Sequence, residues 1–327
     1  MSMTTLVILQ FAGIIAAYTG LTVLLPAVMF RRILKRRRLS EQFLMCYTFG
    51  NFYIINIVFA VQLLHISNFW TLVLLTTVLS ILIWSRVNRI SLKELCIKSG
   101  STCRKILQGS MGLKGILYRG GSRLVGTVKD MIHFFYCKVV CNTLQWILAG
   151  MIIGALFWIY GRQLMLVYGY RASDIPVHLN WINQMSRGNL FVNGVYPFGF
   201  HCMIYYLHTV FRIDTYVILC MFYLVQVFFI HVVLLAAFKM LCKSLYLPYA
   251  GVLVYILGNF WAKQTYSRFA SSLPQEFGMI FVIPSVYFLI RFFQTRKEEL
   301  KTKETKLILG CFALAFSLTL AIHFYGT

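Results

Sequence analysis

Eight long apolar runs constrain this chain more than any other feature of its sequence. Each run has about 20 residues, the helix length that crosses the roughly 30 Å hydrocarbon core of a bilayer. Helices satisfy their own backbone hydrogen bonds there, and the runs are too long and too uniformly apolar for barrel strands. We therefore predict an all-α, polytopic integral membrane protein with spans near residues 3–30, 43–65, 67–85, 143–161, 216–238, 246–262, 277–294 and 307–325.

Composition and charge agree with this class. A hydrophobic fraction of 59% and a mean hydropathy of +0.74 exceed what a soluble domain of 327 residues can bury. The net charge of +22 does not indicate nucleic-acid binding, because the basic residues lie mostly in loops beside the membrane, where anionic lipid explains them.

The Lys and Arg residues also predict the orientation of the chain. Loops 31–42, 86–142, 239–245 and 295–306 hold six, eleven, two and five of them, whereas the loops between these on the other side hold six together. Basic loops stay in the cytoplasm. We therefore expect a multi-pass protein of the plasma membrane with its N-terminus and the loop 162–215 outside.

The chain divides into three parts by this pattern. Residues 1–85 form a three-span membrane module, 86–142 form a basic cytoplasmic segment that is expected to lie on anionic lipid, and 143–327 form a second membrane module. Cysteines indicate no disulfide framework, since most lie in spans or on the cytoplasmic side. Cys137 and Cys141 could share a helix face, but no second ligand pair completes a zinc site.

The outer loop 162–215 concentrates the residues that could carry chemistry. Ser173, Asp174 and Pro176 have the marks of a helix start, and Gly188 those of a helix end. In such a helix Asp174 and His178 are four residues apart, near one face. A carboxylate and an imidazole at a bilayer surface suit proton transfer or ion binding; the alternative is that Asp174 only caps the helix.

A second helix is expected after Tyr196 and Pro197. In it His201, Tyr205 and His208 recur at spacings of four and three, which predicts a polar and aromatic stripe at the membrane surface. The loop thus contributes two interfacial helices. Two further acidic residues face the same side: Asp214, which we expect to cap the fifth span, and Glu276, our candidate for a second carboxylate.

This arrangement resembles the GT-C superfamily of polytopic glycosyltransferases, whose members include protein O-mannosyltransferases, aminoarabinose transferases and oligosaccharyltransferases. The resemblance covers about residues 143–327. It rests on Tyr168, Gly169, Asp174 and His178, on the stretch from Gly194 through Tyr196, Pro197 and Gly199 to His201, and more loosely on the run from Leu273 to Glu276. Many members have two adjacent acidic residues where this chain has Ser173 and Asp174.

The resemblance implies an inverting transfer of a sugar from a polyprenyl-phosphate donor to an extracytoplasmic glycan, lipid or protein acceptor. Asp174 would be the general base or a metal-organising carboxylate, with Glu276 as the second catalytic residue. Arg171, Lys263 or Arg268 would pair with the donor phosphate, and His178, Tyr196 and His201 would line the substrate site. Asp174 and His178 are the expected ligands of a divalent metal ion.

Two other classes of function stay open. A lipid-linked saccharide transporter or polymerase would use the same interface without a catalytic base, and a noncatalytic membrane assembly subunit would need only the aromatic surface. Members of the family continue beyond the point where this chain ends, so an incomplete form is also expected.

Overall fold

We describe a computed structural model of the chain, which covers residues 3–89, 142–162, 172–192, 196–297 and 302–323, together with single residues at 91, 93, 97, 100, 101, 104, 108, 129, 164, 169, 170 and 194. The part of the chain so described is helical and contains no strand, which confirms the all-α class. The basic segment 86–142 lies almost wholly outside the described residues.

The long helices follow the apolar runs. In chain order the elements are α1 (Met3–Thr19), the π-helical turn η1 (Gly20–Leu24), α2 (Leu25–Met29), α3 (Arg31–Leu34), α4 (Leu39–Leu63), α5 (Phe69–Asn88), α8 (Thr143–Leu156), the π-helical turn η2 (Phe157–Gly161), α10 (Ile175–Met185), α11 (Gly199–Phe211), α12 (Thr215–Leu241), α13 (Leu247–Trp261), α14 (Lys263–Phe269), α15 (Pro274–Lys297) and α16 (Thr302–Ile322).

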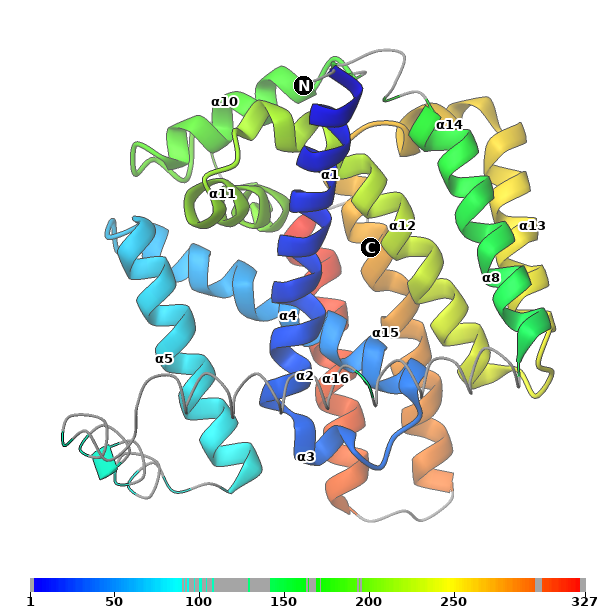
Figure 1. The fold of residues 1–327 in the computed structure, drawn as a ribbon, viewed down its shortest axis with the longest axis horizontal. Coiled ribbons are helices and arrows are strands. Elements are labelled where there is room, and N and C mark those ends of the chain that lie inside the picture. Colours follow the sequence, from blue (N-terminus) through cyan, green and yellow to red (C-terminus); the bar gives the residue numbers. More distant parts are fainter. Residues whose placement is uncertain are drawn as a thin grey trace.

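Seven helical segments of the described chain are long and apolar enough to cross a membrane, one fewer than the eight runs predicted. The difference is α13, which has 15 residues against the roughly 20 that a span needs. It packs beside α8 and leads from the lower end of α12 back to the upper end, where α15 begins (Figure 1).

The bundle has two ends that carry different elements. The N-terminus, α10 and α14 lie at the upper end in Figure 1, whereas α3, the end of α15 and the beginning of α16 lie at the lower end. Which end faces the cytoplasm stays a prediction from the positions of the basic residues. We call the two ends the outer end and the basic end.

The first and last parts of the chain share one core. Tyr18 of α1 contacts Tyr47 of α4 through its hydroxyl, at 2.8 Å, and packs edge-on against Phe222 of α12 and Phe277 of α15. Gly50 allows α4 to touch η1, because a Cβ there would overlap the backbone of Thr22. Residues of the two predicted membrane modules, 1–85 and 143–327, therefore pack together in one core. The boundaries of the three predicted parts stay a prediction.

Candidate functional site

Helices α10 and α11 lie at the outer end and are held there by the turn between α4 and α5. The side-chain amide of Gln62 donates to the carbonyl oxygen of Met185, at 3.1 Å. Nδ1 of His65 lies 3.1 Å from the carbonyl oxygen of Gly188. On α11, the Tyr206 hydroxyl donates to Oγ1 of Thr76 on α5, at 3.0 Å. The outer helices are thus fixed by the first three spans.

Helix α10 begins and ends where the sequence predicts. Pro176 stands in its first turn, and Gly188 just beyond its end has φ of +80°, a conformation that favours glycine. Asp174 precedes the helix but accepts no capping hydrogen bond from it; its Oδ1 accepts instead from the Ser173 hydroxyl, at 3.1 Å. Asp174 is exposed. The carboxylate is therefore not engaged as a helix cap.

His178 and His201 form a buried imidazole pair between α10 and α11. Nδ1 of His178 lies 3.0 Å from Nε2 of His201, so one ring donates and the other accepts. The exposed fractions of these residues are 6% and 0%. Trp181 and Tyr196 pack their rings against His201, with centroids 5.2 and 5.8 Å away. The pair ties the two outer helices together.

Burial sets the protonation of this pair. It lowers the pKa of His178 to about 4, despite an opposing effect of the Asp174 carboxylate, and it lowers the pKa of His201 well below the ordinary value. Both rings are therefore neutral at neutral pH. Nδ1 of His201 and Nε1 of Trp181 are buried and have no hydrogen-bond partner among the described residues.

The stripe of His201, Tyr205 and His208 is not at a surface, contrary to the sequence prediction. His201 and Tyr205 are buried, and His208 is half-buried with Nδ1 2.8 Å from the carbonyl oxygen of Ile213. The physical reason is that α11 packs against α4, α5 and α16. Gly199 permits the last of these contacts, because a Cβ there would lie 2.8 Å from the carbonyl oxygen of Ala321.

The beginning of α15 carries an ion pair. Nε of Arg268 donates to Oε1 of Glu276, at 2.6 Å, and the same guanidinium also contacts Gln275. The Glu276 side chain is 7% exposed and the Arg268 side chain is 48% exposed. Glu276, predicted as a second catalytic carboxylate, thus lies beneath a cation and holds it at the outer end.

The turn before α15 is fixed on α12. The Ser272 hydroxyl accepts from the backbone N–H of Tyr223, at 2.8 Å, and the Gln226 amide donates to the carbonyl oxygen of Leu273, at 2.8 Å. At the head of α12, Oδ1 of Asp214 accepts from the N–H groups of the first turn, at 2.9 and 3.2 Å, so its predicted capping role is confirmed.

His323, directly after α16, connects the two halves of the site. Its ring centroid lies 6.0 Å from that of Tyr196. Burial lowers the pKa of His323, and the charge of Arg268 lowers it further, while His323 in turn lowers the pKa of His178. The sequence analysis did not include His323. Its only signal was a histidine near the outer end of the last predicted span, 307–325.

The remaining predicted residues are less connected. Lys263 is exposed at the start of α14. Arg171 lies outside the described residues. Within the described part of the chain, no three His, Cys, Asp or Glu side chains converge as a metal site. Among the described residues no third ligand joins Asp174 and His178, and the hydrogen bond at Nδ1 leaves Nε2 of His178 as its ligand atom, so metal binding by this pair stays a prediction.

An apolar crevice lies between α1, α8 and α12. Its volume is about 370 Å³, and Phe11, Ile153, Phe157 and Phe228 are among its walls. Gly161 and Leu164, which lead into the outer loop, also line it. Near this point the guanidinium carbon of Arg162 lies 5.2 Å above the exposed Trp158 ring. Such a pair is typical of a membrane surface.

Comparison with known proteins gives no match: no family model fits the chain, and neither the curated proteins nor the solved structures include a similar one. The resemblance described from the sequence therefore stays a hypothesis, and the class that the structure itself defines is a multi-pass helical membrane protein with a polar cluster at its outer end.

Proposed function

We propose that this protein is a membrane glycosyltransferase that moves a sugar from a polyprenyl-phosphate donor to an acceptor outside the cytoplasm. The observation that carries the proposal is an exposed carboxylate at the outer end, Asp174, four residues from His178 of the buried imidazole pair. The Arg268 guanidinium is held by the buried Glu276 carboxylate. These residues belong to α14 and the start of α15, which lie at the same end as α10 (Figure 1). A base and a phosphate-binding cation are the two groups that such a transfer needs.

In the proposed reaction an acceptor hydroxyl attacks the anomeric carbon of the donor sugar. The Asp174 carboxylate takes the hydroxyl proton while the new carbon–oxygen bond forms. The bond from the sugar to the phosphate breaks, and the polyprenyl phosphate leaves with the electron pair. Arg268, with Lys263 or Arg171, neutralises the charge that develops on the phosphate.

Glu276 and the imidazole pair have positioning roles in this scheme. Glu276 fixes the direction of the Arg268 guanidinium through the 2.6 Å ion pair. Neutral His178 and His201 fix α10 against α11, and thereby the position of Asp174. Tyr196, which is half-buried beside Trp181, offers an aromatic face to the substrate sugar. No step requires a metal ion.

The donor lipid would use the apolar crevice between α1, α8 and α12. The crevice is lined by apolar side chains and reaches the residues that begin the outer loop, so an isoprenoid chain in it would bring its phosphate to the outer end. Hydrocarbon is the chemistry that such walls accept.

Asp174→Asn tests the proposal. Asparagine keeps the size of the side chain but cannot take a proton, so we expect transfer to fall by about 100- to 10,000-fold, the usual contribution of a general base. The assay follows radiolabelled sugar from polyprenyl-phosphate donors into the membrane-bound acceptor fraction, at equal protein levels. Asp214→Asn is the matched control, because Asp214 caps α12 and an asparagine there can still cap.

The outcome separates the three classes of function. Full transfer by Asp174→Asn would refute the general-base role. Movement of a lipid-linked saccharide across the membrane without a new glycosidic bond would favour the transporter. Binding of other membrane subunits, unchanged in Asp174→Asn and without transfer or movement, would favour the assembly subunit.

A further inference from the structure

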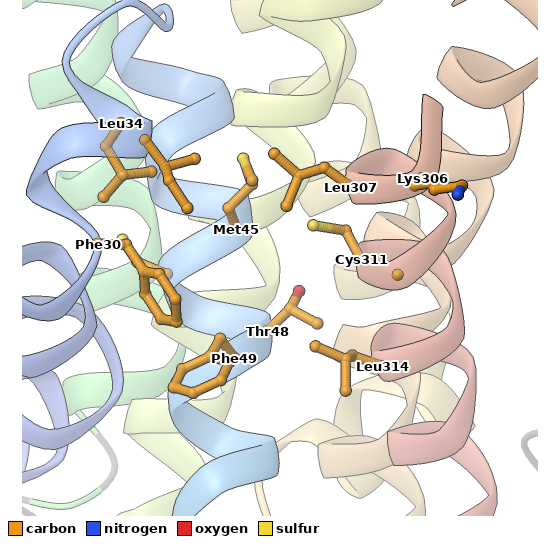
Figure 2. A pocket seen from close by; sticks show the side chains of 12 residues that line it. Phe30, Leu34, Met45, Thr48, Phe49, Lys306, Leu307, Cys311 and Leu314 are labelled. Atoms are coloured by element: carbon orange, nitrogen blue, oxygen red, sulfur yellow. The ribbon is translucent and has the colours of Figure 1, made fainter. Parts of the chain in front are cut away.

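An apolar cavity lies at the basic end of the bundle, far along the chain from the residues of the proposed reaction. Its volume is about 290 Å³. Figure 2 shows Phe30 and Leu34 on one side of it, Met45 and Phe49 on α4, and Leu307 and Leu314 on α16. One wall of the cavity is therefore formed by α4 and the segment around α3, and the other wall by α16.

The size and walls of this cavity suit part of a hydrocarbon chain. An engineered apolar cavity of about 150 Å³ stays dry and binds benzene. This cavity has about twice that volume, 290 Å³, and among the described residues that line it Lys306 is the one cation. A stretch of an acyl chain fits such a space, whereas a whole lipid does not.

Exposed cations neighbour the lining residues of the cavity along the chain. Ile33 and Leu34 of α3 face it, while Arg31, Arg32, Lys35 and Arg36, from the same short segment, are exposed. Lys306 lines the cavity and is itself exposed. This pairing of an apolar space with exposed cations complements a lipid that has a hydrocarbon chain below a negative headgroup.

Arg37 is the exception among these cations. Its guanidinium donates to Glu41 on α4, at 2.7 Å, and to both carboxylate oxygens of Glu304 on α16, at 2.7 and 2.8 Å. This ion cluster neutralises Arg37 and links α4 to α16 beside the cavity. It keeps the two walls at a fixed separation.

We propose that the cavity binds one acyl chain of an anionic phospholipid from the leaflet at the basic end, with the phosphate among the exposed cations of α3 and Lys306. The lipid fills the space that is left between α4 and α16, and so adds to the direct contacts that these helices already make. The site is independent of the proposed sugar transfer.

The test uses the full chain in nanodiscs of phosphatidylcholine that contain a minor amount of phosphatidylglycerol with a photoactivatable group on one acyl chain. After irradiation, peptide mass spectrometry should locate the label on α4 and α16 at the residues that line the cavity. Unlabelled phosphatidylglycerol should compete with the label, and unlabelled phosphatidylcholine should not.

Gly310→Leu is the decisive variant. Gly310 lines the cavity, and a Cβ added there meets no atom within 4 Å, so leucine enters open space without displacing the backbone. Leucine also favours a helix more than glycine does. The variant should fold and lose most of the cavity label. Gly258→Leu on α13, where a Cβ also meets nothing within 4 Å, is the matched control and should keep the label.

Lys306→Gln tests the headgroup. Loss of one cation near the surface should weaken phosphatidylglycerol competition by about fivefold. Unchanged labelling of Gly310→Leu would overturn the cavity as the binding site. Equal competition by phosphatidylcholine, or stronger competition by a polyprenyl phosphate, would overturn the anionic phospholipid as its occupant.

Discussion

The buried imidazole pair predicts that this protein loses stability in mild acid. Burial lowers the pKa of His178 from 6.5 to about 4. The unfolded chain therefore binds a proton at this histidine in a pH range where the folded chain does not. Stability contributed by neutral His178 is complete above pH 6.5, falls as the pH decreases through that value, and stops falling below about pH 4.

The expected magnitude follows from this shift. One pKa unit corresponds to about 1.36 kcal/mol. At pH 5, about 1.5 units below the pKa of His178 in the unfolded chain, this histidine is protonated in the unfolded chain but not in the folded protein. The free energy of unfolding is therefore lower by about 2 kcal/mol than at neutral pH. The pKa of His201 is lowered in the same direction, so its protonation adds to the loss.

Thermal unfolding of the full chain in nanodiscs, measured between pH 7 and pH 5, tests this prediction. His178→Gln keeps a polar group of similar reach but has no proton to gain, so its midpoint should depend less on pH than that of the unaltered protein. His65→Gln is the control, because His65 is exposed. Equal pH dependence of the unaltered protein and His178→Gln would refute the assignment of the acid sensitivity to this pair.

Two further predictions concern packing. Arg37→Met leaves the buried Glu41 carboxylate unpaired and should cost about 3 kcal/mol of stability, measured by thermal unfolding, whereas Arg36→Met at the exposed neighbour should cost little. Restoration of stability by adding Glu41→Gln would support this cause, and an equal loss in both single variants would contradict it. Gly199→Ala should cost about 1–3 kcal/mol, because the new Cβ lies 2.8 Å from a backbone oxygen of α16. Gly154→Ala, where a Cβ meets nothing within 4 Å, should be neutral, and an unaffected Gly199→Ala would show that the two helices separate at little cost.

Local signals in the sequence were sufficient for the elements of the site. Pro176 and Gly188 mark the start and end of α10 to within three residues, and Asp214 caps α12 as expected. Each of these features depends on a few neighbouring residues. The apolar runs likewise locate the long helices, because the thickness of the bilayer sets their length. Only α13 is shorter than its run suggests.

Contacts between distant segments could not be read in the same way. His178 and His201 are 23 residues apart, and their 3.0 Å contact depends on how α10 crosses α11. The spacing of His201, Tyr205 and His208 predicts that they share one face of α11. It does not show which helices cover that face, so the prediction of a surface position was wrong. Arg37 and Glu304, 267 residues apart, are a stronger case, since no local pattern relates them.

The structure also narrows the chemistry that the site residues can perform. His178 and His201 are neutral and bonded to each other, so neither can neutralise a phosphate by charge. Oε1 of Glu276 is bonded to Arg268 and its side chain is almost fully covered, so its role as a second catalytic carboxylate stays a prediction. Of the two predicted catalytic carboxylates, Asp174 is the exposed one, and of the predicted phosphate-binding cations that the structure describes, Arg268 and Lys263 are both exposed. The predicted base and cations therefore come from different elements of the outer end, the start of α10 and the α14–α15 region. In the proposed inverting transfer one substrate complex contacts both, with the acceptor hydroxyl at Asp174 and the donor phosphate at Arg268.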